Sequence, residues 1–323
     1  DKGITARNII TQDSIENAIM ACMAMGGSTN SLIHVPAMAT EAGLDDFDCI
    51  GFFDKASYAV PLLMGVEPNG PHLMKDFERA GGLAALFKTI ESKIHADALT
   101  VTGQTLGQRI QDAKVLDETV IHPLSDPIST EGALAVLRGN IAVDGAIVKQ
   151  SAVPACLMKF RGPVVVFEDV DDAIAGLREG KIRAGNVVVI RMQGAKGGPG
   201  VVTTFPFTSE LAGTPLYDKV ALVTDGRFSG ASKGSAIGHV SPEAAQGGPI
   251  ALVEEGDLIR IDVPGRVLAI VGVKGEEKTP GEIDAILAAR RARWQAKPPK
   301  YKKGLLKRYT EHAVSPMKGA YME

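Results

Sequence analysis

A serine stands just beyond an apolar run, in the position where α/β enzymes often place their chemistry. Residues 220–223 are apolar and predict a buried strand, and Thr-Asp-Gly at 224–226 predicts the turn that ends it. Ser229 follows, among glycines that let a ligand approach the backbone closely. Ser229 is therefore a candidate catalytic residue, and Gly230 is a candidate substrate contact. The alternative is that Ser229 only caps the turn that follows.

Two further polar segments are candidate substrate contacts. Residues 196–200, Lys-Gly-Gly-Pro-Gly, follow a second apolar run at 187–191, and Gly200 allows the loop to pass close to a substrate or metal. Ser28, Thr29 and Asn30 carry side chains that can hydrogen-bond a polar substrate. The same triplet can instead cap the helix expected after it.

The histidines and cysteines do not show the spacing of a metal site. His239 and Glu243 flank Pro242, but Ser-Pro-Glu-Ala-Ala favours a helix that begins at Pro242. Cys22, Cys49 and Cys156 are far apart and odd in number, which predicts neither a disulfide framework nor a zinc site. We therefore expect a reducing, cytoplasmic location.

The ordered blocks of the chain resemble those of the dihydroxy-acid and sugar-acid (phosphogluconate) dehydratase family, whose members convert 2,3-dihydroxy acids to 2-keto acids. The blocks are residues 24–30, 79–82, 137–146, 196–200, 222–232 and 238–249. The last block, beginning Gly-His-Val-Ser-Pro-Glu-Ala, is closest to the dihydroxy-acid dehydratase branch, which serves branched-chain amino acid biosynthesis. The resemblance continues more weakly to the C-terminus.

The resemblance implies that this chain is the C-terminal portion of a longer enzyme. The family uses an iron–sulfur cluster to take the C3 hydroxyl and Mg²⁺ to bind the substrate carboxylate and C2 oxygen. The cluster cysteines and most magnesium ligands of the family belong to an earlier half. Ser229 matches the family's proposed base, which needs a nearby cation or aligned donors to stabilise its alkoxide.

One departure from the family pattern concerns magnesium. Members carry a glutamate ligand three residues after the last glycine of the 196–200 loop, and this chain has Thr203 there. A neutral hydroxyl is a poorer ligand for a hard cation than a carboxylate. Either the metal is held differently, or the chain is a catalytically silent subunit or binding module that kept the fold.

Composition excludes several other classes of protein. The chain has 323 residues, 45% of them hydrophobic, and a net charge of −3, which points to no nucleic-acid partner. No apolar run reaches the ~18 residues of a membrane span, so no membrane association is expected. We expect a small dihydroxy acid as substrate and a cysteine-bearing N-terminal half or partner subunit. Alone the chain should be inactive, and the assembly should be a homo- or hetero-oligomer such as a dimer.

The pattern along the chain predicts an α+β protein. Residues 1–117 carry helical periodicity and are expected to be the helical remainder of an α/β, cluster-bearing domain, followed by a linker at 118–132. Residues 133–323 carry short β-rich runs, which predict a β-barrel domain. The resemblance implies the swivelling, aconitase-C-terminal-like type. Expected strands are residues 133–138, 146–149, 163–167, 187–191, 220–224, 250–253 and 258–263, and expected helices include residues 14–25, 77–90, 170–177 and 281–294.

Overall fold

A computed structural model describes residues 3–230 and 232–323. The chain divides into two compact units, Asp1–Ala135 and Val136–Glu323, here called unit 1 and unit 2. Within the described residues, no helix is long and apolar enough to cross a bilayer.

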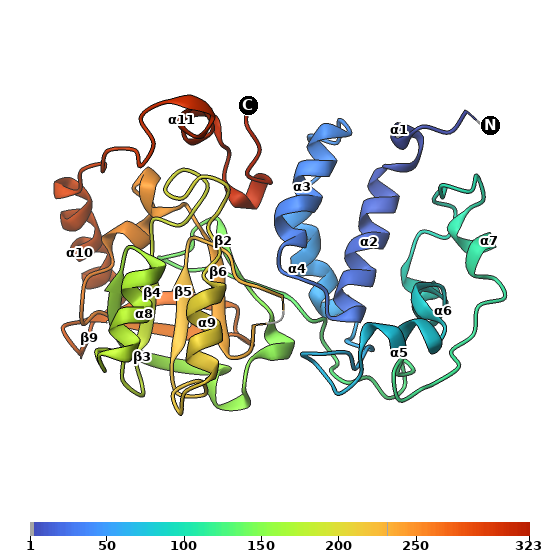
Figure 1. The fold of residues 1–323 in the computed structure, drawn as a ribbon, viewed down its shortest axis with the longest axis horizontal. Coiled ribbons are helices and arrows are strands. Elements are labelled where there is room, and N and C mark those ends of the chain that lie inside the picture. The colour runs from blue at the N-terminus through green and yellow to red at the C-terminus, as the bar shows by residue number, and fades with distance from the viewer. Residues whose placement is uncertain (1–2, 231) are drawn as a thin grey trace. The chain divides into compact units, whose positions relative to one another are not determined.

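Unit 1 is built of short helices (Figure 1). Helix α2 packs against α3, α4 and α6, and their shared core includes the fully buried Ile19, Phe53 and Leu86. The helices are α1 (Ala6–Ile9), α2 (Gln12–Met25), α3 (Ser31–Glu41), α4 (Cys49–Ala59), α5 (Met74–Arg79), α6 (Gly82–Thr89) and α7 (Leu106–Ile110).

Local sequence signals explain where these helices begin and end. Helix α2 begins earlier than the sequence predicted, because the Thr11 hydroxyl accepts a hydrogen bond from Ser14 N at 3.3 Å and acts as the N-cap. Its end at Gly26 is left-handed, with φ of 73°, which a glycine adopts without strain. The helix expected at residues 77–90 is interrupted at its glycine pair, since α5 ends at Arg79 and α6 begins at Gly82.

The described residues of unit 2 form a mixed sheet of nine strands, in the order β1-β2-β6-β5-β4-β3-β7-β8-β9, with helices packed on it. The strands are β1 (Ala135–Leu137), β2 (Gly145–Val148), β3 (Lys159–Phe167), β4 (Val187–Ile190), β5 (Ala221–Thr224), β6 (Ser235–Ser241), β7 (Leu258–Asp262), β8 (Val267–Val273) and β9 (Glu276–Glu277). A bridge between Arg138 and Val267 joins the residue after β1 to β8, so the sheet curls into a partly closed barrel. The predicted α+β class is confirmed; the swivelling, aconitase-like type stays a prediction.

The centre of this sheet is parallel, and this sets where the loops emerge. β3, β4, β5 and β6 run parallel to one another, so their carboxyl ends share one edge. Helices α8 (Val170–Arg178) and α9 (Phe205–Ala212) pack on the apolar side chains of β4 and β5 (Figure 1). The predicted runs at 187–191 and 220–224 are confirmed as buried strands.

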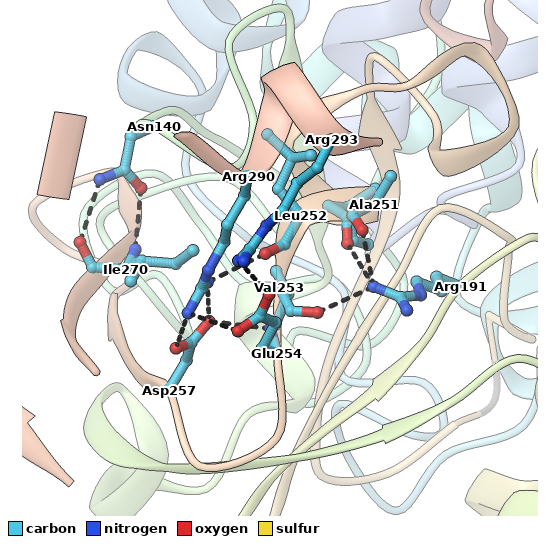
Figure 2. Close-up of polar contacts among 11 residues, drawn as sticks. Asn140, Arg191, Ala251, Leu252, Val253, Glu254, Asp257, Ile270, Arg290 and Arg293 are labelled. Atoms are coloured by element: carbon cyan, nitrogen blue, oxygen red, sulfur yellow. Dashed lines mark hydrogen bonds and ion pairs between the residues drawn. The ribbon is translucent and has the colours of Figure 1, made fainter. Parts of the chain in front are cut away.

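One predicted strand is wrong. Residues 250–253 fall largely in the single-turn helix Pro249–Leu252, and arginines rather than a neighbouring strand take their carbonyl groups. Arg191 donates to the carbonyls of Ala251 at 2.9 Å and Val253 at 2.8 Å, and Arg290 donates to that of Leu252 at 2.9 Å (Figure 2). Charged donors satisfy these buried acceptors without strand pairing.

The C-terminal region carries α10 (Pro280–Arg293) and α11 (Gly304–His312). Arg290 of α10 is buried and forms a two-pronged ion pair with Asp257, at 2.6 and 2.8 Å (Figure 2). Arg293 pairs with Glu254 at 3.0 Å (Figure 2). These two arginines at the end of α10 therefore hold the helix against residues 252–257.

Candidate functional site

The serine turn (residues 225–230) and the glycine loop (residues 196–200) leave the same edge of the sheet. Hydrogen bonds join the serine turn to residues 201–204, which directly follow the glycine loop. Arg227 lies at the centre: its backbone N–H donates to Val202 O at 3.0 Å, its carbonyl accepts from Thr204 N at 2.7 Å, and its Nε donates to Val201 O at 2.7 Å. The carboxyl ends of parallel strands are where α/β sheets bind ligands. The structure thus brings together Gly200, Thr203 and the serine turn.

Ser229 is half-buried in this turn. Its backbone carbonyl accepts a hydrogen bond from Ser232 N at 3.0 Å, which closes the turn through the main chain. The buried Lys149 donates from Nζ to Gly230 O at 3.1 Å, which places an ammonium group beside the residue that follows Ser229. This lysine was missed in the sequence because it lies far from the turn along the chain.

Two buried carboxylates hold the segment that leads into the glycine loop. Asp225 accepts from Gln193 N at 2.8 Å, Met192 N at 3.1 Å and Ala244 N at 2.9 Å. Glu243 Oε1 accepts from Lys196 N at 2.7 Å and Gly197 N at 3.2 Å. The sequence suggested Asp225 only as a turn residue, and it favoured Glu243 as part of a helix beginning at Pro242 over a metal pair with His239.

Burial dominates the electrostatics of this pair. Complete burial raises the pKa of Asp225, although the three backbone N–H groups oppose the shift. Burial and the nearby Asp225 raise the pKa of Glu243 to about 7. Glu243 Oε2 is buried and has no hydrogen-bond partner among the described residues. Two carboxylates in one dry site disfavour double ionisation, so Glu243 titrates near neutral pH.

Helix α11 supports the other side of the glycine loop. Lys196 Nζ donates to Glu311 O at 3.2 Å, and the Tyr309 hydroxyl accepts from Gly200 N and donates to Ala320 O. Burial, with a smaller contribution from Glu243, raises the pKa of Tyr309. A pocket of about 490 Å³ opens beside the loop, with Gln193, Lys196 and Gly197 in its wall.

Thr203 does not have the surroundings of a magnesium ligand. Thr203 is exposed, its hydroxyl accepts from Phe205 N at 3.3 Å, and only its backbone pairs with that of Arg227. The nearby carboxylate of Glu210 does not replace it, because Glu210 forms a two-pronged ion pair with Arg178 at 2.6 and 2.8 Å. A neutral hydroxyl is a poor ligand for a hard cation.

The triplet Ser28, Thr29 and Asn30 belongs to unit 1. Asn30 is the N-cap residue of α3 but makes no side-chain capping bond, and Ser28 Oγ accepts from Asn30 N at 3.3 Å. Thr29 is fully buried, and its hydroxyl has no partner among the described residues. Thr29 therefore lies under the surface of unit 1, and its role as a substrate contact stays a prediction.

The residues present do not fit an iron–sulfur cluster or a magnesium ion. Across residues 3–230 and 232–323, no three His, Cys, Asp or Glu side chains group as a metal site. Cys49 is buried beside Asp48, and burial raises the pKa of its thiol to about 11, which disfavours the thiolate that a cluster needs. Cys22 lies in unit 1 and Cys156 is exposed in unit 2.

The predicted helix at Pro242 is also wrong. Ser241 is the last residue of β6, and only the single turn Ala244–Gln246 follows. Glu243 precedes that turn, so its side chain reaches the N–H groups of the glycine loop. His239 is buried in β6 with φ of 55°.

Comparison with known proteins gives a family for both parts of the chain. The model described as Dihydroxy-acid/6-phosphogluconate dehydratase C-terminal matches residues 119–320, and its N-terminal counterpart matches residues 1–109. The dihydroxy-acid dehydratases of Agathobacter rectalis and Lachnospira eligens are 48% and 49% identical over 324 and 325 residues. That of Ignicoccus hospitalis is 46% identical over 325 residues.

These alignments cover 100% of this chain but 56% of the first two relatives and 57% of the third. The chain thus spans a little over half the length of the curated relatives it matches. The resemblance drawn from the ordered sequence blocks is confirmed, and the chain belongs to the dihydroxy-acid/6-phosphogluconate dehydratase family.

Proposed function

We propose that this chain is the C-terminal part of a hydro-lyase that converts a 2,3-dihydroxy carboxylic acid to a 2-keto acid. The observation that carries the proposal is that Arg227 binds the serine turn to residues 201–204, directly after the glycine loop, at the carboxyl edge of the parallel strands. Family membership and the name shared by the relatives support it. A cysteine-bearing N-terminal half would complete the enzyme, which agrees with the finding that this chain spans a little over half the length of the matched relatives.

In this proposal Ser229 takes the proton from C2 of the substrate. The C3–O bond breaks, and the leaving hydroxyl takes up the proton that Ser229 removed from C2 and departs as water. The resulting enol loses its hydroxyl proton and gains a proton from solvent at C3, which gives the 2-keto acid. An isolated serine is too weak a base for this step unless positive charge stabilises its alkoxide. The ammonium of Lys149, bound to Gly230 O, contributes such charge from this chain. No step is assigned to a cluster or magnesium ion, because the residues present do not fit either.

The competing proposal is a silent subunit or binding module that kept the fold. The exposed Thr203, at the position where the family resemblance implies a glutamate ligand, supports it. Both proposals place the same surface at the carboxyl edge of the sheet. They differ only in whether Ser229 moves a proton.

Keto-acid formation by the whole protein, assayed with a branched-chain dihydroxy acid and with a sugar acid, separates the two proposals. Ser229→Ala should lower kcat by about 10²–10⁴-fold with little change in KM, because a general base acts in the transition state. The control is Ser125→Ala, an exposed serine in unit 1, which should leave turnover intact. Equal rates for the two variants would refute the assignment of Ser229.

A further inference from the structure

We propose that Glu243, together with Asp225, is a positioning residue that sets the conformation of the glycine loop through its backbone N–H groups. This goes beyond the base assigned to Ser229, and its meaning for turnover rests on the proposed function. The loop's own glycines cannot hold it, because glycine restricts the backbone least of all residues. Its order must come from groups outside the loop.

Hydrogen bonds to the side chains of Asp225 and Glu243 hold the backbone of the glycine loop and the segment before it in place. Asp225 receives the N–H groups of Met192 and Gln193, at the exit of β4, and Glu243 receives those of Lys196 and Gly197. The carboxylates therefore fix two successive stretches of one segment. Asp225 also receives Ala244 N, so it fixes the residue after Glu243 and ties the two anchors together.

Steric fit points to the same role. A Cβ atom at Gly194 would lie 1.9 Å from Glu243 Oε2 and 2.8 Å from Glu243 Cβ, so only glycine allows this approach. The carboxyl group therefore fills the space beneath the loop, between the anchored stretches. Both carboxylates are buried, Asp225 completely and Glu243 with 2% exposure, so water does not compete for the loop N–H groups.

The anchored segment connects directly to the candidate site. Val202 N donates to Gln193 O at 2.8 Å, and Val202 O accepts from Arg227 N in the serine turn. Lys196 and Gly197 also form part of the wall of the neighbouring pocket. Moving the segment would therefore move both the pocket wall and the support of the turn that carries Ser229.

The charged and titratable groups that face Glu243 determine how the opening of the glycine loop depends on pH. Asp225 faces it from the end of β5, Lys196 from the glycine loop and Tyr309 from α11. Opening the loop lets Glu243 reach water, where it ionises more readily than when buried beside Asp225. Opening should therefore become easier as the pH rises toward 7 and should then level off.

Hydrogen exchange in the whole protein, measured by mass spectrometry on peptides covering residues 192–202, tests the inference. Glu243→Met keeps the length of the side chain but removes the acceptor, and protection of these peptides should fall at least tenfold. Glu243→Gln keeps the acceptor and should stay within threefold of the wild type at pH 5. Corrected for intrinsic rates, wild-type protection should fall severalfold to tenfold per pH unit between 5 and 7, and that of Glu243→Gln should stay flat.

Val263→Ala is the matched control, since Val263 is fully buried in unit 2 and is not among the anchors of the loop. It should lower stability without selective loss of protection at residues 192–202. Unchanged protection in Glu243→Met, or an equal loss in Val263→Ala, would overturn the inference. Turnover is a separate readout: kcat should fall in Glu243→Met and recover in Glu243→Gln. If protection follows Glu243 while the wild type forms no keto acid, the positioning role stands and the proposed function fails.

Discussion

Glu243→Gln should remove a pH dependence from the stability of unit 2. Burial beside Asp225 raises the pKa of Glu243 from its ordinary 4.5 to about 7. Between these pH values the folded chain keeps a proton that the unfolded chain releases, so stability is fully present below 4.5 and is lost as the pH rises through 7. At about 1.4 kcal/mol per pH unit, the loss amounts to roughly 3 kcal/mol. Glutamine does not ionise and should not show it.

The fluorescence of the single tryptophan, Trp294, can be used to follow the unfolding of unit 2. Trp294 lies against Gly247 in unit 2, so its fluorescence during urea unfolding reports that unit. Wild type and Glu243→Gln should be compared at half-unit steps from pH 5 to pH 8, since other titrating groups act equally on both. The free energy of unfolding of the wild type should fall relative to the variant by about 2–3 kcal/mol over this range. Parallel curves would refute the link between Glu243 burial and stability.

Three further changes have expected outcomes. Gly194→Ala should destabilise unit 2 by about 1–3 kcal/mol in the Trp294 assay, because the new methyl group meets Glu243. Gly281→Ala should be neutral or stabilising, because a methyl group added there meets no atom within 4 Å outside its own helix turn. Equal effects of the two changes would contradict the packing argument. Asp257→Asn should cost about 3 kcal/mol, because it leaves the buried Arg290 with only the half-exposed Glu254, at 3.2 Å, as a charged partner. The exposed Asp284→Asn should change stability by less than about 0.5 kcal/mol, and a similar result for both would argue against the ion pair. The chain purified alone and treated anaerobically with iron and sulfide should stay colourless, because among the described residues no three His, Cys, Asp or Glu side chains group as a metal site and Cys49 is buried with a raised thiol pKa. Stoichiometric iron and sulfide on this polypeptide would overturn that expectation.

Local patterns in the sequence were enough to predict several elements. The apolar runs that became β4 and β5 are buried on both faces, so they stand out as continuous hydrophobic stretches. Helix α10 was predicted closely, because Thr279, Pro280 and Glu282 form a strong start signal that acts within one turn. The ordered blocks of residues also carried the family, since each block is contiguous in the chain.

Other elements depended on groups distant in the sequence. β6 was missed because its run of Ser, Gly and His has no apolar pattern, yet every residue of it is buried between β2 and β5. Residues 250–253 have a strand-like composition, but Arg191 and Arg290 occupy their carbonyls and hold them in a turn. A strand is stabilised by the neighbouring strand that it pairs with, and a short stretch of sequence does not show which segment that neighbour will be.

The residues of the candidate site also divide into those that the local sequence reveals and those that only the folded structure brings together. The sequence by itself determined which residues are present at the ends of the strands: Ser229 after one apolar run, and the glycine loop and Thr203 after another. Only the tertiary structure decided that Asp225 and Glu243 meet beneath the glycine loop and that Lys149 reaches Gly230. Parallel strands bring distant carboxyl ends to one edge, and burial there changes the chemistry of a carboxylate. Both effects arise from packing between segments and are absent from any one of them.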